Sequence, residues 1–280
     1  MSGPLVEISN LRVDFPSHGE WRPAVRGLSL SLGREKLGIV GESGSGKSVT
    51  GRALMGLLPA KARVQADSLR FDGQDLLGLP ERRFRKLRGA RMGLILQDPK
   101  YSLNPVMTAG QQIAEAWATH KRGSRAEARD AAFSLLEQVK IRDPRRVYDA
   151  YPHEVSGGMG QRVMIAMMLA PEPDLLIADE PTSALDATVQ TEILRLIDEL
   201  VSARGMGLML ISHDLPLVSR FCDRVMVMYA GQVMEVLPAK DLAHARHAYT
   251  RGLLACLPRL DEGQHRLPVL NRDPAWLRPQ

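Results

Sequence analysis

The chain has 280 residues, of which 44% are hydrophobic and 25% are charged, proportions typical of a soluble globular protein that buries a core. Its longest apolar run, residues 163–170, ends at a proline and is far shorter than the roughly 20 residues that span a bilayer, which excludes an integral membrane protein. The net charge of +5 is only mildly basic, and an aromatic content of 5% offers little surface for base stacking, so we expect no nucleic-acid partner.

Alternating hydrophobic and polar residues predict strands at 11–15 and 28–32, separated by a loop that contains glycine and proline. An apolar run at 37–40 predicts a third strand. A loop of glycine and serine follows it, and we expect a helix from about Lys47 to Leu57. The order is therefore strand, glycine-rich loop, helix.

Hydrophobic residues at helical spacing dominate from Thr108 to Lys140, and we interpret residues 100–158 as an inserted helical subdomain. Strands and helices alternate again beyond it, as in an α/β fold whose buried parallel strands are continuous apolar runs. We assign no regular element to the tail after Pro258, which is polar and rich in proline. The predicted elements after the subdomain are strands at 175–178 and 208–211, a helix around 189–201, and a hairpin of 225–229 with 232–236.

Residues 41–48, G-E-S-G-S-G-K-S, fit the phosphate-loop pattern G-x-x-x-x-G-K-[ST] at every fixed position, between a predicted strand and a predicted helix. The glycines let successive backbone N–H groups point at phosphate oxygens, and the helix N-terminus adds positive potential. Lys47 would reach the β- and γ-phosphates of a nucleotide, and the Ser48 hydroxyl would bind Mg²⁺.

A second motif, D-L-L-I-A-D-E at 174–180, is an apolar strand that ends in two carboxylates. An acid at the carboxyl end of a parallel strand, next to a phosphate loop, is placed to hold Mg²⁺, and Asp179 is the expected ligand. Glu180 follows it and is the expected general base, which would polarise an attacking water.

A third motif, S-G-G-M-G-Q-R at 156–162, places small residues at the start of a predicted helix, where nothing bulky would block a second anion. It resembles the signature motif of the ABC-transporter ATPases, usually L-S-G-G-Q. Gln97 after an apolar strand matches the Q-loop of that family, residues 183–186 match its D-loop, and His213 at the end of another strand matches its H-loop. The motifs stand in the order that the family has.

The resemblance covers about residues 5–257 and leaves a short tail at 258–280. It implies an α/β fold with a P-loop, RecA-like core, an antiparallel β subdomain and the inserted α-helical subdomain. It also implies an enzyme that hydrolyses ATP with Mg²⁺ and couples hydrolysis to transport of a solute across a membrane.

The resemblance further implies roles for individual residues. Glu180, His213 and Gln97 would be catalytic, and Ser48, Gln97 and Asp179 would hold the metal. Phe15 is the expected aromatic that stacks on adenine, with Trp21 as the alternative. The other implied contacts to ATP come from Gly41, Glu42, Ser43, Gly44, Ser45, Gly46, Lys47, Ser48 and Val49, and those to the nucleotide of a partner subunit come from Ser156, Gly157, Gly158, Met159 and Asp186.

Within the family, the chain looks most like the ATPases of dipeptide, oligopeptide and nickel importers. The similarity rests on residues 37–48, on S-L-N-P at 102–105, on Met159 in place of the signature glutamine, and on His247 and Tyr249 near the end. It implies import of peptides. Import of nickel or a metallophore is the alternative within this branch, and a soluble ABC ATPase that regulates or scaffolds a cytosolic complex is the alternative of another class.

Three departures weaken the choice between peptide and nickel. Val155 precedes the signature where leucine or phenylalanine is commoner. Ala248 stands where the branch usually has proline in H-P-Y-T, and the tail lacks the cysteine-rich segment by which some peptide-importer ATPases bind an iron–sulfur cluster. The branch implies a peripheral location on the cytoplasmic face of the inner membrane. It also implies three kinds of partner: a second ABC ATPase, most often a different chain and hence a heterodimer, two permeases, and an extracytoplasmic solute-binding protein.

Overall fold

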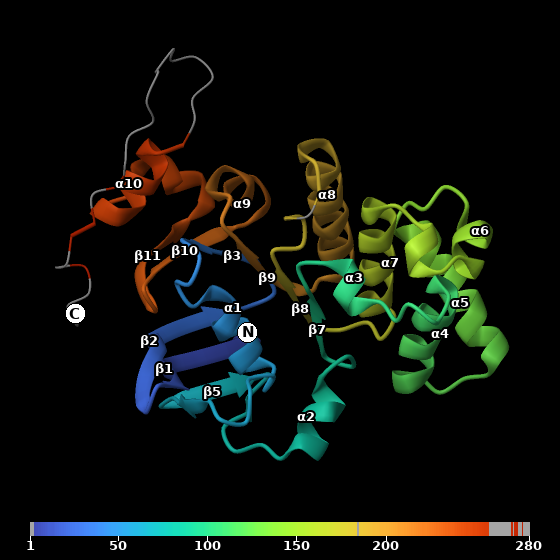
Figure 1. Cartoon of the computed structure of the whole chain (residues 1–280), viewed down its shortest axis with the longest axis horizontal. Coiled ribbons are helices and arrows are strands. Elements are labelled where there is room, and N and C mark those ends of the chain that lie inside the picture. The colour runs from blue at the N-terminus through green and yellow to red at the C-terminus, as the bar shows by residue number, and fades with distance from the viewer. Residues whose placement is uncertain (1–2, 184, 258–269, 271, 274–275, 277–280) are drawn as a thin grey trace, which may run out of the picture. The chain divides into compact units, whose positions relative to one another are not determined.

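The computed structural model describes residues 3–183, 185–257, 270, 272, 273 and 276 (Figure 1). The chain divides into two compact units. Unit 1 joins residues 1–77 to residues 210–280, and unit 2 is the continuous stretch 78–209. The boundary falls inside one strand, β9 (Gly207–Ser212), so this strand contributes residues to both units.

Unit 1 contains a five-stranded sheet in the order β2-β1-β5-β6, with β4 also paired to β1. All of its pairings are antiparallel. Leu11 and Val13 of β1 are fully buried and Arg12 between them is exposed, and this alternation confirms the strand predicted at 11–15. The strands of the sheet are β1 (Val6–Ser17), β2 (Glu20–Leu32), β4 (Arg63–Gln65), β5 (Ser68–Phe71) and β6 (Gln74–Asp75).

A second set of strands in unit 1 follows the order β11-β10-β3-β9. The strand β3 (Lys36–Gly41) runs parallel to β10 (Arg224–Tyr229), which pairs in turn with β11 (Gln232–Pro238) in the antiparallel hairpin that the sequence predicts. The hairpin turns at Ala230 and Gly231, both of which have positive φ.

Helices flank these strands in unit 1. The helix α1 begins at Lys47 as predicted but ends at Leu54, three residues early, because Gly56 takes a left-handed conformation with φ of 60° and the chain then turns. The glycine at position 38 lets α9 approach β3, since a Cβ there would lie 1.9 Å from Val218 Cγ1. The helices are α1 (Lys47–Leu54), α9 (Leu215–Phe221), the 3₁₀ helix η2 (Ala239–His244) and α10 (Ala248–Ala255).

Unit 2 contains strands in the order β9-β8-β7. The strands β7 (Met92–Ile95) and β8 (Leu175–Asp179) are parallel, and every residue of β8 is buried, as its continuous apolar sequence predicts. Arg91 and Asp174 form an ion pair just before the two strands begin, and the N–H of Asp174 also donates to the Arg91 carbonyl oxygen at 2.9 Å.

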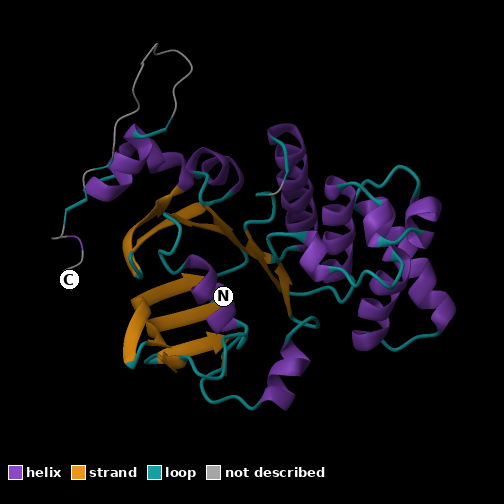
Figure 2. Ribbon diagram, in the orientation of Figure 1, coloured by secondary structure: helices purple, strands orange, loops and turns teal. Residues whose placement is uncertain are grey.

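Most of unit 2 is helical (Figure 2). The helical signal over 108–140 resolves into two helices, α4 (Ala109–His120) and α5 (Arg125–Gln138), because Thr108 and Ser124 each begin a new helix with a capping box. Among the described residues, no helix is both long and apolar enough to cross a membrane. The other helices of the unit are α2 (Glu81–Leu87), α3 (Pro99–Ser102), α6 (Pro144–Asp149), η1 (Pro152–Glu154), α7 (Gly157–Leu169) and α8 (Ala187–Arg204).

Candidate functional site

The loop at 41–48 connects β3 to α1, as the sequence predicts, and two of its glycines have no room for a side chain. A Cβ on Gly41 would lie 2.1 Å from the carbonyl oxygen of Met228, and one on Gly46 would lie 2.5 Å from that of Ala24. Both glycines also have positive φ, 151° and 97°, which other residues rarely adopt. These two fixed glycines therefore allow the loop to pack closely against the backbone of β2 and β10.

The loop is lined with donors that suit a phosphate. Lys47 is only 5% exposed, and its Nζ donates to the carbonyl oxygens of Gly41, at 2.9 Å, and Glu42, at 2.8 Å. Ser45 is 2% exposed, and its Oγ has no hydrogen-bond partner within the part of the chain that the structure describes. A buried lysine and an unsatisfied buried hydroxyl at the N-terminus of a helix fit a nucleotide phosphate.

Tyr249 supports this loop, a role at the site that the sequence does not predict. It lies in α10, is 0% exposed, and its hydroxyl accepts a hydrogen bond from the Glu42 N–H at 3.4 Å. Burial raises the pKa of Tyr249 to about 12, so the phenol is protonated at neutral pH. His247 caps α10 by accepting from the Tyr249 N–H at 3.1 Å. The H-A-Y-T sequence at 247–250 was the signal that could have indicated this contact.

The other predicted residues of unit 1 lie at the ends of strands. Phe15 is half-buried near the end of β1, opposite Arg22 of β2. The alternative aromatic, Trp21, has the guanidinium of Arg63 over its ring at 3.6 Å from the centroid, so one face of the indole is already in contact with a cation. His213 is exposed and directly follows β9.

Asp179 and Glu180 follow each other at the carboxyl end of β8 in unit 2. Asp179 is the last residue of the strand and is 5% exposed, whereas Glu180 is half-buried. Glu180 has φ of 48°, a conformation that costs a residue other than glycine about 1 kcal/mol or more, and its carbonyl oxygen accepts from the Ser183 N–H at 3.3 Å. The turn thus holds Glu180 in a strained conformation, as is common for functional residues.

The signature residues form the start of α7. Ser156 is the N-cap, and its hydroxyl accepts from the Met159 N–H at 3.3 Å. Gly158 allows α8 to pass close by, since a Cβ there would lie 2.9 Å from Val189 Cγ1. Asp186 is the N-cap of α8, where its carboxylate accepts from the Val189 N–H at 3.0 Å. The predicted D-loop aspartate therefore has a capping role in the fold.

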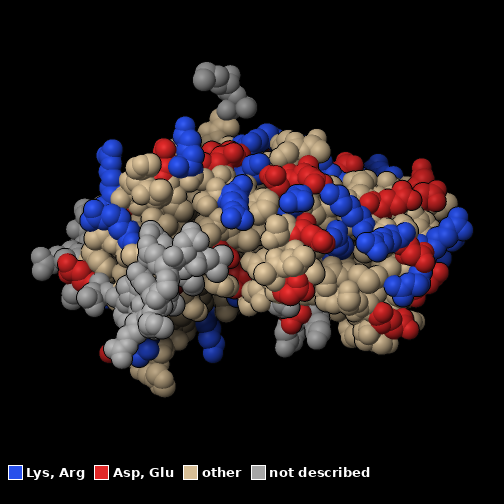
Figure 3. Space-filling view, turned by 90° about the horizontal axis from the view of Figure 1, so that it is seen from above, with Lys and Arg blue, Asp and Glu red and all other residues tan. Residues whose placement is uncertain are grey.

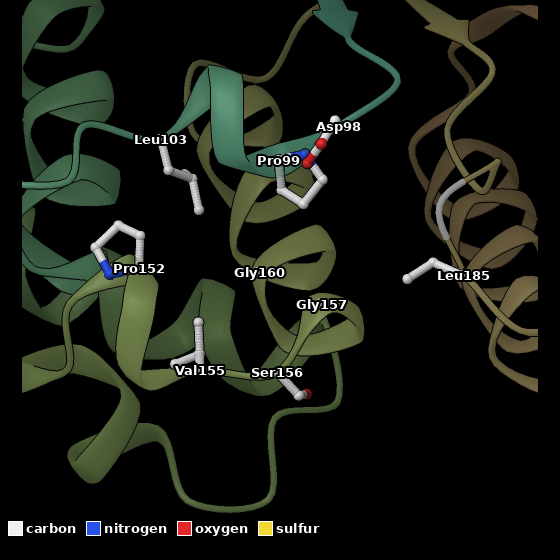
Figure 4. A pocket seen from close by; sticks show the side chains of 9 residues that line it. All are labelled: Asp98, Pro99, Leu103, Pro152, Val155, Ser156, Gly157, Gly160 and Leu185. Atoms are coloured by element: carbon white, nitrogen blue, oxygen red, sulfur yellow. The ribbon is translucent and has the colours of Figure 1, made fainter.

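A pocket of about 200 Å³ opens beside the signature in unit 2 (Figure 4). Gln97 is exposed in a bend shortly after β7, and the next residue, Asp98, lies on the pocket wall. The start of α7 forms another part of the wall with Ser156 and Gly157, and Leu185 closes one side. The lining residues are Asp98, Pro99, Leu103, Pro152, Val155, Ser156, Gly157, Gly160 and Leu185.

Charged side chains of both signs are interspersed on the face shown in Figure 3. Two ion pairs connect α8 to neighbouring segments of unit 2. Lys140, just after α5, pairs with Glu199 of α8 at 2.5 Å, and Arg162 of α7 pairs with Glu192 of α8 at 3.1 Å. These partly exposed pairs contribute at most about 1 kcal/mol each, so the packing of the helices depends mainly on their apolar faces.

The predicted site residues are divided between the two units. The residues in unit 1 are Phe15, 41–49 and His213, and those in unit 2 are Gln97, 156–159, Asp179, Glu180 and Asp186. The roles assigned to them remain predictions.

The chain is similar to known proteins in sequence and in structure. Residues 25–183 match the family model described as ABC transporter. The chain is 48% identical over 268 residues to the dipeptide transport ATP-binding protein DppD of Escherichia coli (strain K12), which covers 95% of this chain and 82% of that protein. It is 47% identical over 277 residues to the oligopeptide transport ATP-binding protein OppD of the same organism, covering 98% and 82%.

Solved structures of known proteins also superimpose on this chain. A dimeric ATP-binding cassette in a post-hydrolysis state, bound to ADP and Pi, superimposes with a TM-score of 0.72 at 27% identity, covering 84% of this chain and 98% of that one. The cbiO1 protein of Clostridium perfringens, part of the ABC transporter complex cbiONQ, gives a TM-score of 0.73 at 26% identity, covering 90% and 95%. The predicted fold class is thereby confirmed.

Proposed function

The chain belongs to the ABC transporter family, and on that premise we propose that it is the ATP-hydrolysing subunit of an importer of short peptides. The observation that carries this proposal is the extent of the similarity to transport ATP-binding proteins for dipeptides and oligopeptides. The identity of 47–48% extends over at least 95% of this chain and is therefore not confined to the nucleotide motifs that all ABC ATPases share.

The phosphate loop would bind the triphosphate of ATP. Its backbone N–H groups, the Lys47 ammonium and the buried Ser45 hydroxyl are the donors that support this role. Phe15 would stack on the adenine. When bound, Mg²⁺ would neutralise charge on the phosphates, and the residues proposed to hold it are Ser48, Gln97 and Asp179.

Glu180 is the proposed general base for hydrolysis. Its carboxylate would accept a proton from the attacking water, His213 would contact the γ-phosphate, and Gln97 would sense the water and the metal. The strained backbone of Glu180 supports this assignment, because such conformations persist where function requires them.

The signature residues 156–159 and Asp186 would act on the ATP of a second ATPase subunit, proposed to be a different chain. The small residues at the N-terminus of α7 support a second anion site there. Two permeases would receive the motion through the surface between Gln97 and the helices that follow it, where the pocket of about 200 Å³ lies. An extracytoplasmic solute-binding protein would deliver the peptide. The ATPase itself would be peripheral, at the cytoplasmic face of the membrane.

Two alternatives would change the proposal in different ways. Import of nickel or a metallophore would keep the ATPase and the permeases but replace the cargo. If the protein were a soluble regulator or scaffold, it would still hydrolyse ATP but would have no permeases and no cargo. The similarity to transport ATP-binding proteins over at least 95% of the chain favours the transporter.

The test is purification of the tagged protein from its native membranes in a mild detergent, with identification of the co-purifying chains by mass spectrometry. Two permeases, a second ATPase and a solute-binding protein are the expected result. The recovered complex would then be placed in liposomes, where di- and oligopeptides with the binding protein should raise the rate of ATP hydrolysis. Stimulation by nickel or a metallophore instead would overturn the choice of cargo, and recovery from the cytosol without permeases would overturn the transporter.

A further inference from the structure

Every polar group of Glu42, the second residue of the phosphate loop, has a partner within unit 1. Its N–H donates to the Tyr249 hydroxyl at 3.4 Å, and its carbonyl oxygen accepts from Lys47 Nζ at 2.8 Å. Its carboxylate accepts a hydrogen bond from the guanidinium of Arg272 at 3.1 Å. Two of these contacts come from the loop and the adjacent helix α10, but the third comes from the last ten residues of the chain.

Other described residues of the tail also pack against other parts of unit 1. The indole of Trp276 lies edge-on to the ring of Tyr249, with the centroids 5.6 Å apart, and it also contacts the ring of Tyr229 at 5.9 Å. Leu270 lies against α10, where Gly252 leaves room for it, since a Cβ on this glycine would come within 2.1 Å of Leu270 Cδ1. The tail thus reaches Glu42 directly through Arg272 and indirectly through Trp276 and Tyr249.

The charge of Glu42 matters for nucleotide binding. It is the only acidic residue in the loop at 41–48, and its carboxylate would repel the phosphates of ATP. The guanidinium of Arg272 neutralises it, and the carboxylate in turn raises the pKa of Arg272 by hydrogen bonding, so the arginine is always charged. An arginine at this place therefore compensates an unfavourable charge in the phosphate loop.

We infer that Arg272 is a positioning residue of the nucleotide site, which draws the Glu42 carboxylate away from the phosphates and, together with Trp276, fastens the phosphate loop in the conformation that binds ATP. This inference rests on the nucleotide site of the proposed function. It assigns to the tail a part in ATP binding by the same subunit.

The exposed fractions of the Arg272 and Glu42 side chains determine how much ATP binding should weaken when their ion pair is lost. The Arg272 side chain is 58% exposed and that of Glu42 is 31% exposed, so the ion pair is partly screened by water. Loss of the pair should therefore weaken ATP binding about two- to fivefold, with the larger change at low ionic strength.

The experiment measures the dissociation constant of ATP by calorimetry, at low and high salt, for the full chain and five variants, one of which is the Glu42→Gln background itself. Arg272→Gln is expected to weaken binding, and Arg272→Lys is expected to restore most of the affinity. In a Glu42→Gln background, Arg272→Gln should have little further effect, because the charge that it compensates is gone. Arg251→Gln, which changes an exposed arginine of α10, is the matched control and should bind like the wild type.

A second measurement needs no nucleotide. Hydrogen exchange of the Glu42 amide, which donates to Tyr249, should become faster in Trp276→Ala while the melting temperature of the protein changes little. The inference is overturned if Arg272→Gln binds ATP as tightly as the wild type, or if its effect is the same with and without the Glu42 carboxylate. Failure of the wild-type protein to bind ATP would instead overturn the proposed function itself.

Discussion

The Nζ atom of Lys47 lies 2.9 Å from the carbonyl oxygen of Gly41, the first residue of the same phosphate loop. The lysine thus closes the loop on itself, with 5% of the residue exposed. A phosphate oxygen offers a stronger acceptor than a carbonyl, because it carries negative charge. The ammonium group is therefore held close to where the nucleotide would bind.

Lys47→Ala should weaken ATP binding about 10- to 100-fold, which corresponds to the loss of one hydrogen bond to a charged group. Binding of ATP, measured by calorimetry, checks this expectation. Lys61→Ala is the control, since Lys61 is an exposed lysine of the same unit. Equal affinities of the two variants would contradict a phosphate-binding role for Lys47.

Glu180→Gln should keep the affinity for ATP but lower the rate of hydrolysis by about 10²- to 10⁴-fold, because the amide cannot accept the proton of the attacking water. Release of phosphate in single-turnover assays measures the chemical step separately from binding. The control is Glu137→Gln, at an exposed position of α5. Phosphate release at the wild-type rate by Glu180→Gln would rule this residue out as the base.

Gly110→Ala should destabilise unit 2. A Cβ at this position of α4 would lie 2.1 Å from Cδ2 of Tyr148, whose ring is held by stacking on Phe133 with the centroids 4.5 Å apart. Because the added methyl group must displace the ring, we expect a loss of about 1–3 kcal/mol in the free energy of unfolding, measured in urea. Gly33→Ala, where a Cβ would meet nothing within 4 Å, should be close to neutral. A Gly110→Ala variant as stable as Gly33→Ala would show that the ring moves freely.

Tyr249 should make the protein sensitive to alkaline pH. The phenol keeps its proton in the folded protein up to a pKa of about 12, whereas the unfolded chain loses it near pH 10. Between pH 10 and 12 the phenol is therefore ionised in the unfolded chain but protonated in the folded protein, and this favours the unfolded state. The free energy of unfolding should fall by about 1.4 kcal/mol for each pH unit in this range. Below pH 10 this residue should cause no change.

Comparison of wild type with Tyr249→Phe isolates this contribution, because the other groups that titrate at high pH are common to both. As the pH rises from 10 to 12, the free energy of unfolding of the wild type should fall relative to that of Tyr249→Phe. Parallel curves for wild type and Tyr249→Phe would contradict the prediction.

The sequence predicts the elements of this fold well where a single periodicity dominates. The buried strand β8 and the hairpin of β10 and β11 were predicted almost to the residue, because an apolar run or a short turn defines each of them locally. The short strands β4 and β6 were missed. They have two or three exposed residues each and owe their conformation to pairing with β1 and β5.

The site shows the same distinction. The place of the loop at 41–48 between a strand and a helix, and that of the carboxylates at the end of β8, could be predicted because a motif fixes both the residue types and their spacing, whereas their roles stay predictions. The contacts of Glu42 with Tyr249 and Arg272 could not, since they join residues more than 200 positions apart and have no spacing rule. Only the folded chain brings such residues together.

The division of the chain has a consequence for its synthesis on the ribosome. Both neighbours of β3 in the sheet, β9 and β10, are encoded after position 206, whereas β3 and the phosphate loop come before position 49. Unit 2, by contrast, is a continuous stretch, so all of its residues have been made once residue 209 is translated. The strand β3, which leads into the loop at 41–48, therefore gains both of its neighbours in the sheet only when most of the chain has been translated.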